Sequence, residues 1–315
     1  MTNSKFAMKR TWRVFLPGTV LMMAGVLMLF GMAACGGSGS GQEGQMVSYT
    51  DDYQHTALIP VSPRRVVSTS PAVTEIVYAL NAEDLLVGRT DFCVYPPEAR
   101  GIPTIGGISN LNVEKIASLE PDLVISGSMI PQKSTLQLDR MGIPLVCVIE
   151  KQHFDGLYEN IAKIGQLVGR THEADSLISR LKGQAVALGT QPGNDSLSRP
   201  GVYYVVGFGA SGNFTAGGNS FINDLITMAG GRNIAADING WSYSLEALMQ
   251  ENPDFIIIRK EDSATFCRTA PYNQLSAVQQ GRVIAIESGM IDLQVPRNLQ
   301  AISFIKQRLN EKGGW

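Results

Sequence analysis

The sequence predicts an α/β protein of two similar lobes joined by one long helix. One observation is a motif that occurs twice, 132 residues apart: Glu114 precedes Pro121-Asp122 as Glu246 precedes Pro253-Asp254. A second is the alternation of short apolar strands with helices, which is typical of parallel sheets covered on both faces. The third is a stretch with helical periodicity between the two copies. Two lobes imply a cleft between them, and clefts between domains are common ligand sites.

The N-terminus is typical of an export signal, which we place at residues 1–34. Four basic residues precede an apolar stretch at 20–30, and small residues lead to Cys35. The apolar stretch is short for a membrane span. It fits either a plain signal peptide cleaved near Ala34 or a lipoprotein signal in which Cys35 becomes the lipidated first residue. The Gly/Ser-rich segment directly after Cys35 favours the lipoprotein, with residues 35–48 as a flexible tether.

The first lobe is expected at residues 49–152, preceded by a small hairpin at 46–60 that overlaps its start. Helices are expected at 70–80, 113–119 and 134–141, and Pro71 lies in the first turn, where helices accept proline. The continuous apolar runs predict buried strands at 65–69, 85–88, 103–105, 123–126 and 144–149.

Residues 153–190 are expected to be linker helices, one ending at 168 and a longer one at 172–188. A single long helix between the lobes would make a stiff connection. The second lobe, 191–315, repeats the order of the first. It has expected strands at 201–206, 255–259 and 283–287, and helices at 220–228, 273–279 and 298–309, besides the second motif copy.

Charge and cysteine content limit the partners and the compartment. Without residues 1–34, which hold four basic and no acidic residues, the chain has 22 Lys and Arg against 28 Asp and Glu, a net charge of −6. That balance argues against a nucleic-acid partner. Cys147 lies in an apolar strand and is expected to be a buried small hydrophobe. Cys93 and Cys267 are expected in loops, where they could pair in an oxidising compartment.

Catalytic patterns are weak. The chain has three histidines, and none lies in a nucleophile or metal-ligand pattern. The segment Gly207–Gly212 reads Gly-x-Gly-x-x-Gly after an expected strand, but the next helix starts only near residue 220, whereas the dinucleotide fingerprint opens its helix directly. A loop lining the cleft is therefore favoured. The alternative, a doubly wound α/β enzyme that uses this loop for a cofactor, stays open.

Aromatic residues gather in the loops expected after strands, where α/β sheets bind ligands. Side chains of this kind would suit a large, flat, partly apolar ligand. Arg89, Arg259 and Arg297 could add polar contacts or could serve in structural salt bridges. The candidate ligand-binding residues are Phe92, Tyr95, Phe208, Phe214, Trp241, Tyr243 and Arg297.

Glu114 and Glu246 lie in the first turns of their expected helices, behind the capping residues Asn112 and Ser244. An acid there interacts favourably with the helix dipole, by roughly 0.3–1 kcal/mol. The same position on two lobes also suits a pair of acids that grip a two-fold partner bearing arginines. The residues alone leave both roles open.

Between about residues 49 and 311 the chain resembles the substrate-binding proteins of bacterial ABC importers for cobalamin and iron complexes such as siderophores and haem. The resemblance implies the class III periplasmic binding protein fold, two α/β lobes joined by one rigid helix. It also implies no enzymatic activity and no resident cofactor. The motifs that carry it are Arg65–Ser68 with Ser70–Glu75, Tyr95-Pro96-Pro97, Asn112–Glu114 with Pro121–Ile125, and Ser244–Glu246 with Pro253-Asp254.

The family's docking acids match Glu114 and Glu246, which implies a permease dimer with its ATPase as partner. Phe92 stands where cobalamin binders have a Tyr, Ile108 stands near where they have a Trp, and Trp241 approximates the aromatic residue of the second lobe. The resemblance thus implies an extracytoplasmic, membrane-anchored lipoprotein that captures a metal chelate. A cobalamin-type corrinoid is favoured over a ferric siderophore or haem.

Overall fold

The computed structural model describes residues 44–128, 130–189 and 199–311, which belong to one unit comprising residues 42–315. The expected signal peptide, Cys35 and most of the tether lie outside the described residues. Within the described ranges, no helix combines the length and the apolar character needed to cross a membrane.

A hairpin leads into the first lobe, as expected. Strand β1 (Met46–Thr50) pairs antiparallel with β2 (Thr56–Pro60). Ile59 is buried in the core, and Tyr49 and Ala57 pack against it. The alternation of the two strands thus gives the hairpin one inward face, which attaches it to the lobe.

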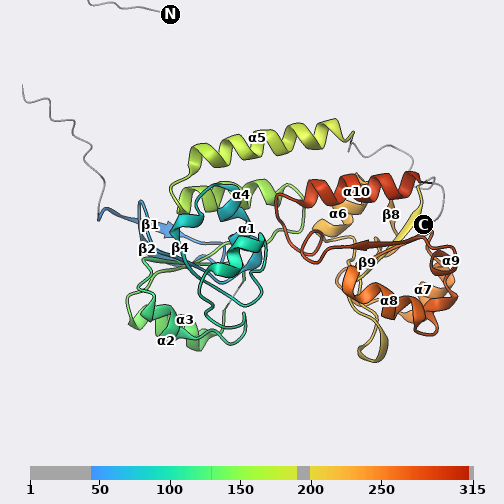
Figure 1. Cartoon of the computed structure of the whole chain (residues 1–315), viewed down its shortest axis with the longest axis horizontal. Helices are drawn as coiled ribbons and strands as arrows, with labels where there is room; N and C mark the ends of the chain where they lie inside the picture. Colours follow the sequence, from blue (N-terminus) through green and yellow to red (C-terminus); the bar gives the residue numbers. More distant parts are fainter. Residues whose placement is uncertain (1–43, 129, 190–198, 312–315) are drawn as a thin grey trace, which may run out of the picture. The chain divides into compact units, whose positions relative to one another are not determined.

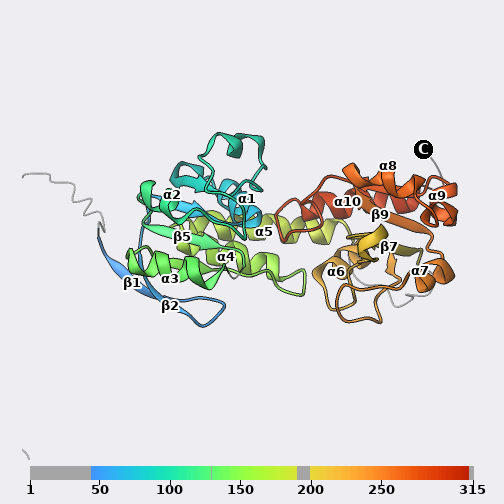
Figure 2. The same cartoon turned by 90° about the horizontal axis from the view of Figure 1, so that it is seen from below.

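The first lobe is a four-stranded parallel sheet in the order β4-β3-β5-β6. Helices α1 and α4 pack together on one face, and α2 and α3 on the other (Figures 1 and 2). Val66 and Val67 point to opposite faces, so each strand contributes to both apolar clusters. The elements are β3 (Val66–Ser68), α1 (Pro71–Ala79), β4 (Leu86–Arg89), α2 (Val113–Ser118), β5 (Leu123–Ser126), α3 (Gln132–Arg140), β6 (Leu145–Cys147) and α4 (Gly156–Leu167).

The second lobe repeats this topology with the order β8-β7-β9-β10, also parallel. In both sheets the first strand of the lobe lies between the second and the third. Helix α10 packs with α6 as α4 packs with α1. The elements are β7 (Gly201–Val205), α6 (Phe221–Met228), β8 (Arg232–Asn233), α7 (Leu245–Glu251), β9 (Phe255–Arg259), α8 (Lys260–Arg268), α9 (Ser276–Gln279), β10 (Val283–Ile286) and α10 (Asn298–Asn310).

The repeated Pro-Asp has the same structural role in each lobe. The carboxylate of Asp122 accepts hydrogen bonds from the backbone N–H groups of Arg64 and Arg65 at 2.7 and 3.1 Å, just before β3. The carboxylate of Asp254 accepts one from the N–H of Gly201 at 2.6 Å, at the start of β7. Each Asp therefore ties the start of the lobe's third strand to the start of its first strand.

Helix α5 (Thr171–Ala187) connects the two lobes. Its first part packs against α4 of the first lobe and its last part contacts α10 of the second, as Figure 1 shows. Of the two helices expected in the linker, α4 covers the first sheet, and only α5 extends from one lobe to the other. One apolar cluster includes residues of both lobes and of α5, among them Val77, Leu181 and Ile302. The predicted fold class, two similar α/β lobes joined by a long helix, is confirmed.

Four local expectations were wrong or incomplete. Residues 103–105 form one isolated bridge, Arg89 with Thr104, because Gly106 turns the chain away at φ 94°. The expected helix 273–279 is divided by extended Leu275 into a 3₁₀ turn (Tyr272–Gln274) and α9. Helix α8 was not anticipated, because its sequence is polar and Phe266 is its one buried residue. Strand β8 has two residues, too few for periodicity to detect. Further 3₁₀ turns are Glu83–Leu85, Pro97–Gly101 and Gly209–Ser211.

Cys93, Cys147 and Cys267 are free thiols in the structure, so the suggested pair is not formed. Cys147 is buried in β6, as expected, and burial, with a smaller contribution from the charge of Asp51, raises its pKa to about 12. Cys267 lies in α8 rather than in a loop. That correction follows from the unanticipated helix.

Candidate functional site

The segments that follow the carboxyl ends of the two sheets meet each other. Glu75 lies in α1 after β3, Tyr95 follows β4, and Arg297 follows β10. The guanidinium of Arg297 donates two hydrogen bonds to the Glu75 carboxylate, each 2.7 Å long. Its central carbon lies 3.9 Å from the centre of the Tyr95 ring. The edges at which open α/β sheets bind ligands therefore face each other across this contact.

The Glu75–Arg297 pair is shielded from water, with side-chain exposures of 4% and 10%. Burial raises the pKa of Glu75, and the hydrogen bonds and charge of Arg297 offset part of that effect. Paired, bidentate geometry is what makes two buried charges tolerable. No local pattern could have identified Glu75, because its partner lies 222 residues away.

Gln294 makes a second connection between the lobes. Its side-chain oxygen accepts from the N–H of Lys151 at 2.8 Å, and its side-chain nitrogen donates to the carbonyls of Lys151 and His153 at 2.9 and 2.8 Å. Its own backbone N–H donates to the Glu150 carboxylate at 3.0 Å. Nearby, the N–H of Phe154 donates to Asp224 of α6 at 2.9 Å. The loop before α4 and the loop before α10 are thus each bonded to the opposite lobe.

Four of the six candidate aromatic side chains are exposed. Phe92 and Tyr95 follow β4 with exposures of 60% and 41%, and Phe214 and Trp241 lie in the second lobe with 37% and 49%. The chain brings the last two together, because Phe214 bridges to Ser242 and the N–H of Thr215 donates to the carbonyl of Trp241. Each lobe therefore presents two partly exposed aromatic rings, and the Arg297 guanidinium covers one face of the Tyr95 ring.

The other two aromatic residues pack inside the second lobe. Phe208 makes edge contacts with Phe266 and Tyr272, with ring centres 5.2 and 5.7 Å apart. Tyr243 packs on Tyr203 at 5.7 Å. Both are only partly exposed, so they support the loop that carries Phe214 and Trp241.

The glycine-rich loop folds back on itself. Phe214 bridges to Gly207, and its ring lies 3.2 Å from where a Cβ on Gly207 would stand. Helix α6 begins only at Phe221, behind the capping residue Ser220. The loop therefore does not lead directly into a helix N-terminus that could bind a phosphate, as the loop of the dinucleotide fingerprint does.

Arg89 and Arg259 have structural partners within their own lobes. The Arg89 guanidinium donates to the carbonyls of Ala99, Thr90 and Arg100. Arg259 pairs with Asp262 at 2.8 Å and donates to the carbonyl of Val206. Arg259 thus forms a salt bridge of the kind suggested, whereas Arg89 is held by hydrogen bonds to backbone carbonyls.

Glu114 and Glu246 occupy matching places, each the second residue of the helix that precedes the lobe's third strand. Asn112 and Ser244 cap these helices by accepting from the N–H groups of Lys115 and Ala247, at 2.8 and 3.0 Å. Both glutamates are exposed. Their carboxylates are therefore available to a partner that contacts both lobes.

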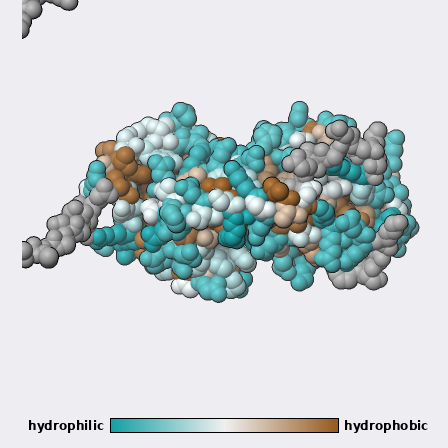
Figure 3. Space-filling view, turned by 90° about the horizontal axis from the view of Figure 1, so that it is seen from above, coloured by the Kyte–Doolittle hydropathy of each residue, from teal (hydrophilic) through white to brown (hydrophobic). Residues whose placement is uncertain are grey.

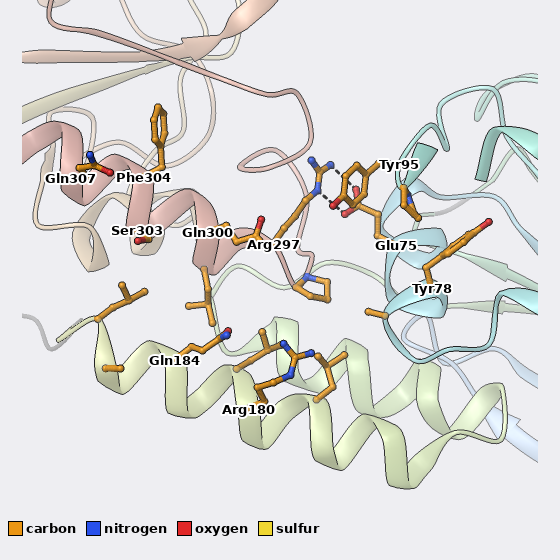
Figure 4. Close-up of a pocket in the computed structure, with 18 residues that line it drawn as sticks. Glu75, Tyr78, Tyr95, Arg180, Gln184, Arg297, Gln300, Ser303, Phe304 and Gln307 are labelled. Carbon is orange, nitrogen blue, oxygen red and sulfur yellow. Dashed lines mark hydrogen bonds and ion pairs between the residues drawn. The ribbon is translucent and has the colours of Figure 1, made fainter. Parts of the chain in front are cut away.

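A cavity of about 860 Å³ lies beside the Glu75–Arg297 contact (Figure 4). Its walls come from α1, α5, α10 and the Tyr95-Pro96 segment. Phe92, Phe214 and Trp241 do not line it, whereas Tyr95 and Arg297 do. Among the described residues, no group of three or more metal-ligating side chains could hold an ion.

Comparison with known proteins agrees with this geometry. The model of the family described as periplasmic binding protein matches residues 66–289. A cobalamin-binding protein of Halobacterium salinarum is 29% identical over 266 residues, covering 80% of this chain and 71% of that protein. An uncharacterized ABC transporter substrate-binding lipoprotein of Bacillus subtilis, YvrC, is 28% identical over 268 residues, covering 84% and 85%.

A solved structure has the same arrangement of elements. The periplasmic heme-binding protein RhuT from Roseiflexus sp. RS-1, in its apo form, superposes with a TM-score of 0.68 at 25% identity. The match covers 78% of this chain and 97% of that one.

Proposed function

The chain belongs to the periplasmic binding protein family and has its class III fold, and we propose that it captures a metal chelate outside the cytoplasm and delivers it to an ABC importer. The observation that carries this proposal is the pair of exposed aromatic rings on each lobe, Phe92 with Tyr95 and Phe214 with Trp241. They follow the facing carboxyl edges of two sheets. A flat, partly apolar ligand held between such surfaces would bury apolar area on both sides.

A corrinoid of the cobalamin type is the ligand we propose first. The Halobacterium salinarum relative is named for cobalamin binding. The structurally similar Roseiflexus protein is named for heme binding, which makes haem the second ligand to test, followed by ferric siderophores. All three are large chelates whose apolar faces suit stacking on aromatic rings.

The partner in this proposal is a permease dimer with its ATPase. Glu114 and Glu246 would contact arginines of the two permease subunits, since their helices occupy equivalent places on the two lobes. Cys35 would carry the lipid that keeps the protein at the membrane. The name of the Bacillus subtilis relative, a substrate-binding lipoprotein of an ABC transporter, supports both parts.

Tryptophan fluorescence tests the ligand assignment. The chain has three tryptophans, at positions 12, 241 and 315. In residues 36–315, Trp315→Phe therefore leaves Trp241 as the sole tryptophan. Titration with cyanocobalamin should quench its emission strongly and saturably, with a Kd below micromolar after inner-filter correction. Haem and ferric siderophores are titrated in parallel, and whichever chelate saturates identifies the cargo class.

Two variants show whether the ligand lies at the aromatic loops. Phe92→Ala and Phe214→Ala remove exposed rings, one from each lobe, and each should weaken binding by about 1–2 kcal/mol because the stacking is lost. Leu136→Ala, which removes a 48% exposed side chain from α3, is the control and should leave affinity unchanged. Absence of binding by every chelate would refute the proposal.

A further inference from the structure

We propose that the cavity between α5 and α10 is a second binding site, for a small monoanionic amphiphile with a linear apolar body, of the type of a fatty carboxylate. Phe92, Phe214 and Trp241 do not line this cavity, so most of it lies away from the rings proposed to hold the chelate. It shares only Tyr95 and Arg297 with the candidate residues for the chelate.

The cavity is long, open to solvent between α5 and α10, and lined by both apolar and polar side chains. The lining residues of α5 extend from Leu177 to Leu188, about 16 Å at 1.5 Å per residue, and those of α10 from Leu299 to Gln307, about 12 Å. One end is formed by Glu75, Tyr95 and Arg297. Near the other end the amine of Lys306 donates to the carbonyl of Leu188, which joins α10 to the end of α5. The apolar lining side chains include Tyr78, Leu177, Leu181, Leu188, Leu299 and Phe304.

The charged side chains of the lining leave one positive charge, which favours an anionic ligand. Glu75 and Arg297 neutralise each other. Arg180 is the remaining charged side chain of the lining, and no acidic residue pairs with it in the described part of the chain. Arg180 is exposed, and Figure 4 shows its guanidinium close to α5. One exposed cation at the edge of a partly apolar cavity matches one carboxylate on an apolar chain.

The polar neighbours of Arg180 are neutral. Gln184 on α5 and Gln300, Ser303 and Gln307 on α10 can donate or accept hydrogen bonds without adding charge. Such groups would orient a polar head, while Tyr78, Leu188 and Phe304, which keep part of their surface exposed, would contact the chain behind it. A volume of about 860 Å³ lies in the range of small-molecule sites.

The surface around α5 favours a small ligand over a protein partner. Figure 3, which views the molecule from the side of α5, shows a mostly hydrophilic surface with separate small apolar patches. A stable protein interface needs a broad patch with an apolar centre. The leucines of the cavity lining, Leu177, Leu181 and Leu299, are buried and add little to this surface.

Calorimetric titration of residues 36–315 with decanoate tests the proposal, because that span includes the whole unit of residues 42–315. We expect saturable binding of one decanoate per chain below its micellar concentration. Arg180→Ala should weaken decanoate binding about tenfold or more, because the charge-assisted contact is lost. The same substitution should leave binding of the neutral 1-decanol unchanged.

Two further variants make the test specific. Lys182→Ala removes the same charge from the same helix, but this amine lies over the Tyr158 ring, 5.1 Å from its centre, outside the cavity, and decanoate affinity should not change. Ser303→Trp fills the cavity from an exposed position of α10 and should abolish binding of both amphiphiles. No saturable decanoate binding, equal losses in Arg180→Ala and Lys182→Ala, or full binding by Ser303→Trp would each overturn the proposal. None of these results depends on which chelate the aromatic loops bind.

Discussion

At the scale of single residues, the pKa values of two carboxylates of the first lobe are shifted in opposite directions. Burial raises the pKa of Glu150; the backbone N–H of Gln294 lowers it in part, and the charge of Asp292 raises it further. Burial also opposes ionisation of Asp52, but hydrogen bonds from Lys163 and Lys151 and the N–H of Ile149 outweigh it, so its pKa is lowered. The two groups therefore affect stability with opposite dependence on pH.

Glu150→Gln should stabilise the protein at pH 7. An acid with a raised pKa in the folded state makes folding less favourable as pH rises from its unfolded pKa through its folded pKa. Glutamine does not titrate, and its side-chain oxygen can still accept from Gln294. Urea unfolding should give the variant a higher free energy of unfolding than wild type at pH 7, and the two values should be equal near pH 4. A variant that is less stable than wild type at pH 7 would contradict this.

Asp52→Asn should have the reverse effect and serves as the matched control. A lowered folded pKa adds stability that is present above the unfolded pKa and is lost as pH falls through the folded pKa. The ion pairs with Lys151 and Lys163 are partly exposed, so the loss at pH 7 should be about 0.5–1 kcal/mol. In the same series of urea unfolding experiments, the difference in free energy of unfolding between the variant and wild type should disappear at acidic pH. A deficit that persists unchanged at pH 2 would contradict the electrostatic origin.

At the scale of elements, α1 and the segment entering α10 are joined by the Glu75–Arg297 pair, with Tyr95 stacked on the guanidinium. No other described ion pair that joins the two lobes has both side chains so well shielded. The pair connects helices that cover different sheets. It therefore couples the position of the Tyr95 loop to the second lobe.

Removing one partner of this pair should be far more damaging than removing both. Glu75→Leu leaves the Arg297 charge buried without its partner and should cost about 3–5 kcal/mol of unfolding free energy. Adding Arg297→Met to the same chain should recover most of that loss, because apolar side chains of similar volume can replace a buried ion pair. Urea unfolding of the single and double variants measures the coupling. Additive losses would mean that the two charges do not stabilise each other.

At the scale of the whole described unit, the lobes are held by more than the linker helix. Helix α5, the Gln294 hydrogen bonds and the Glu75–Arg297 pair all connect them. Large hinge motions need segments that can change backbone conformation freely. Here the loop before α4 and the loop before α10 are each hydrogen-bonded to the opposite lobe.

Ligand binding should therefore move the lobes little. The radius of gyration of residues 36–315, measured by solution X-ray scattering, should be the same within error before and after saturation with the chelate. The double variant Glu75→Leu/Arg297→Met loses one interlobe connection and is the comparison in which a ligand-dependent change is expected. A marked contraction of the wild-type protein would contradict the rigid arrangement.

The two exposed glutamates should matter for delivery and not for capture. Glu114→Ala with Glu246→Ala should abolish chelate uptake into cells while chelate affinity stays at the wild-type value. Loss of the helix-dipole interactions should cost only about 0.3–1 kcal/mol of stability at each site. Glu251→Ala, an exposed acid at the end of α7, is the control and should transport normally. Wild-type uptake by the double variant would disprove the docking role.

The sequence by itself determined the fold class, the two-lobe repeat and most element positions. These depend on local properties: apolar runs that must be buried, capping residues such as Asn112 and Ser244, and a periodicity that marks α5. It failed where local signals were absent, as in polar α8 and two-residue β8. It also indicated aromatic loop residues, but it could not separate Phe208 and Tyr243, which pack inside the second lobe, from Phe92 and Trp241, which are exposed.

Only the tertiary structure decided how distant residues combine. Arg297 could be read as a ligand contact or a salt-bridge residue, and the choice depends on Glu75, 222 positions away. The cavity between α5 and α10 likewise arises from the spacing of two helices, which no periodicity records. The physical reason is that burial, pairing and empty volume are properties of packed surfaces, and a sequence pattern describes only one of the surfaces that meet.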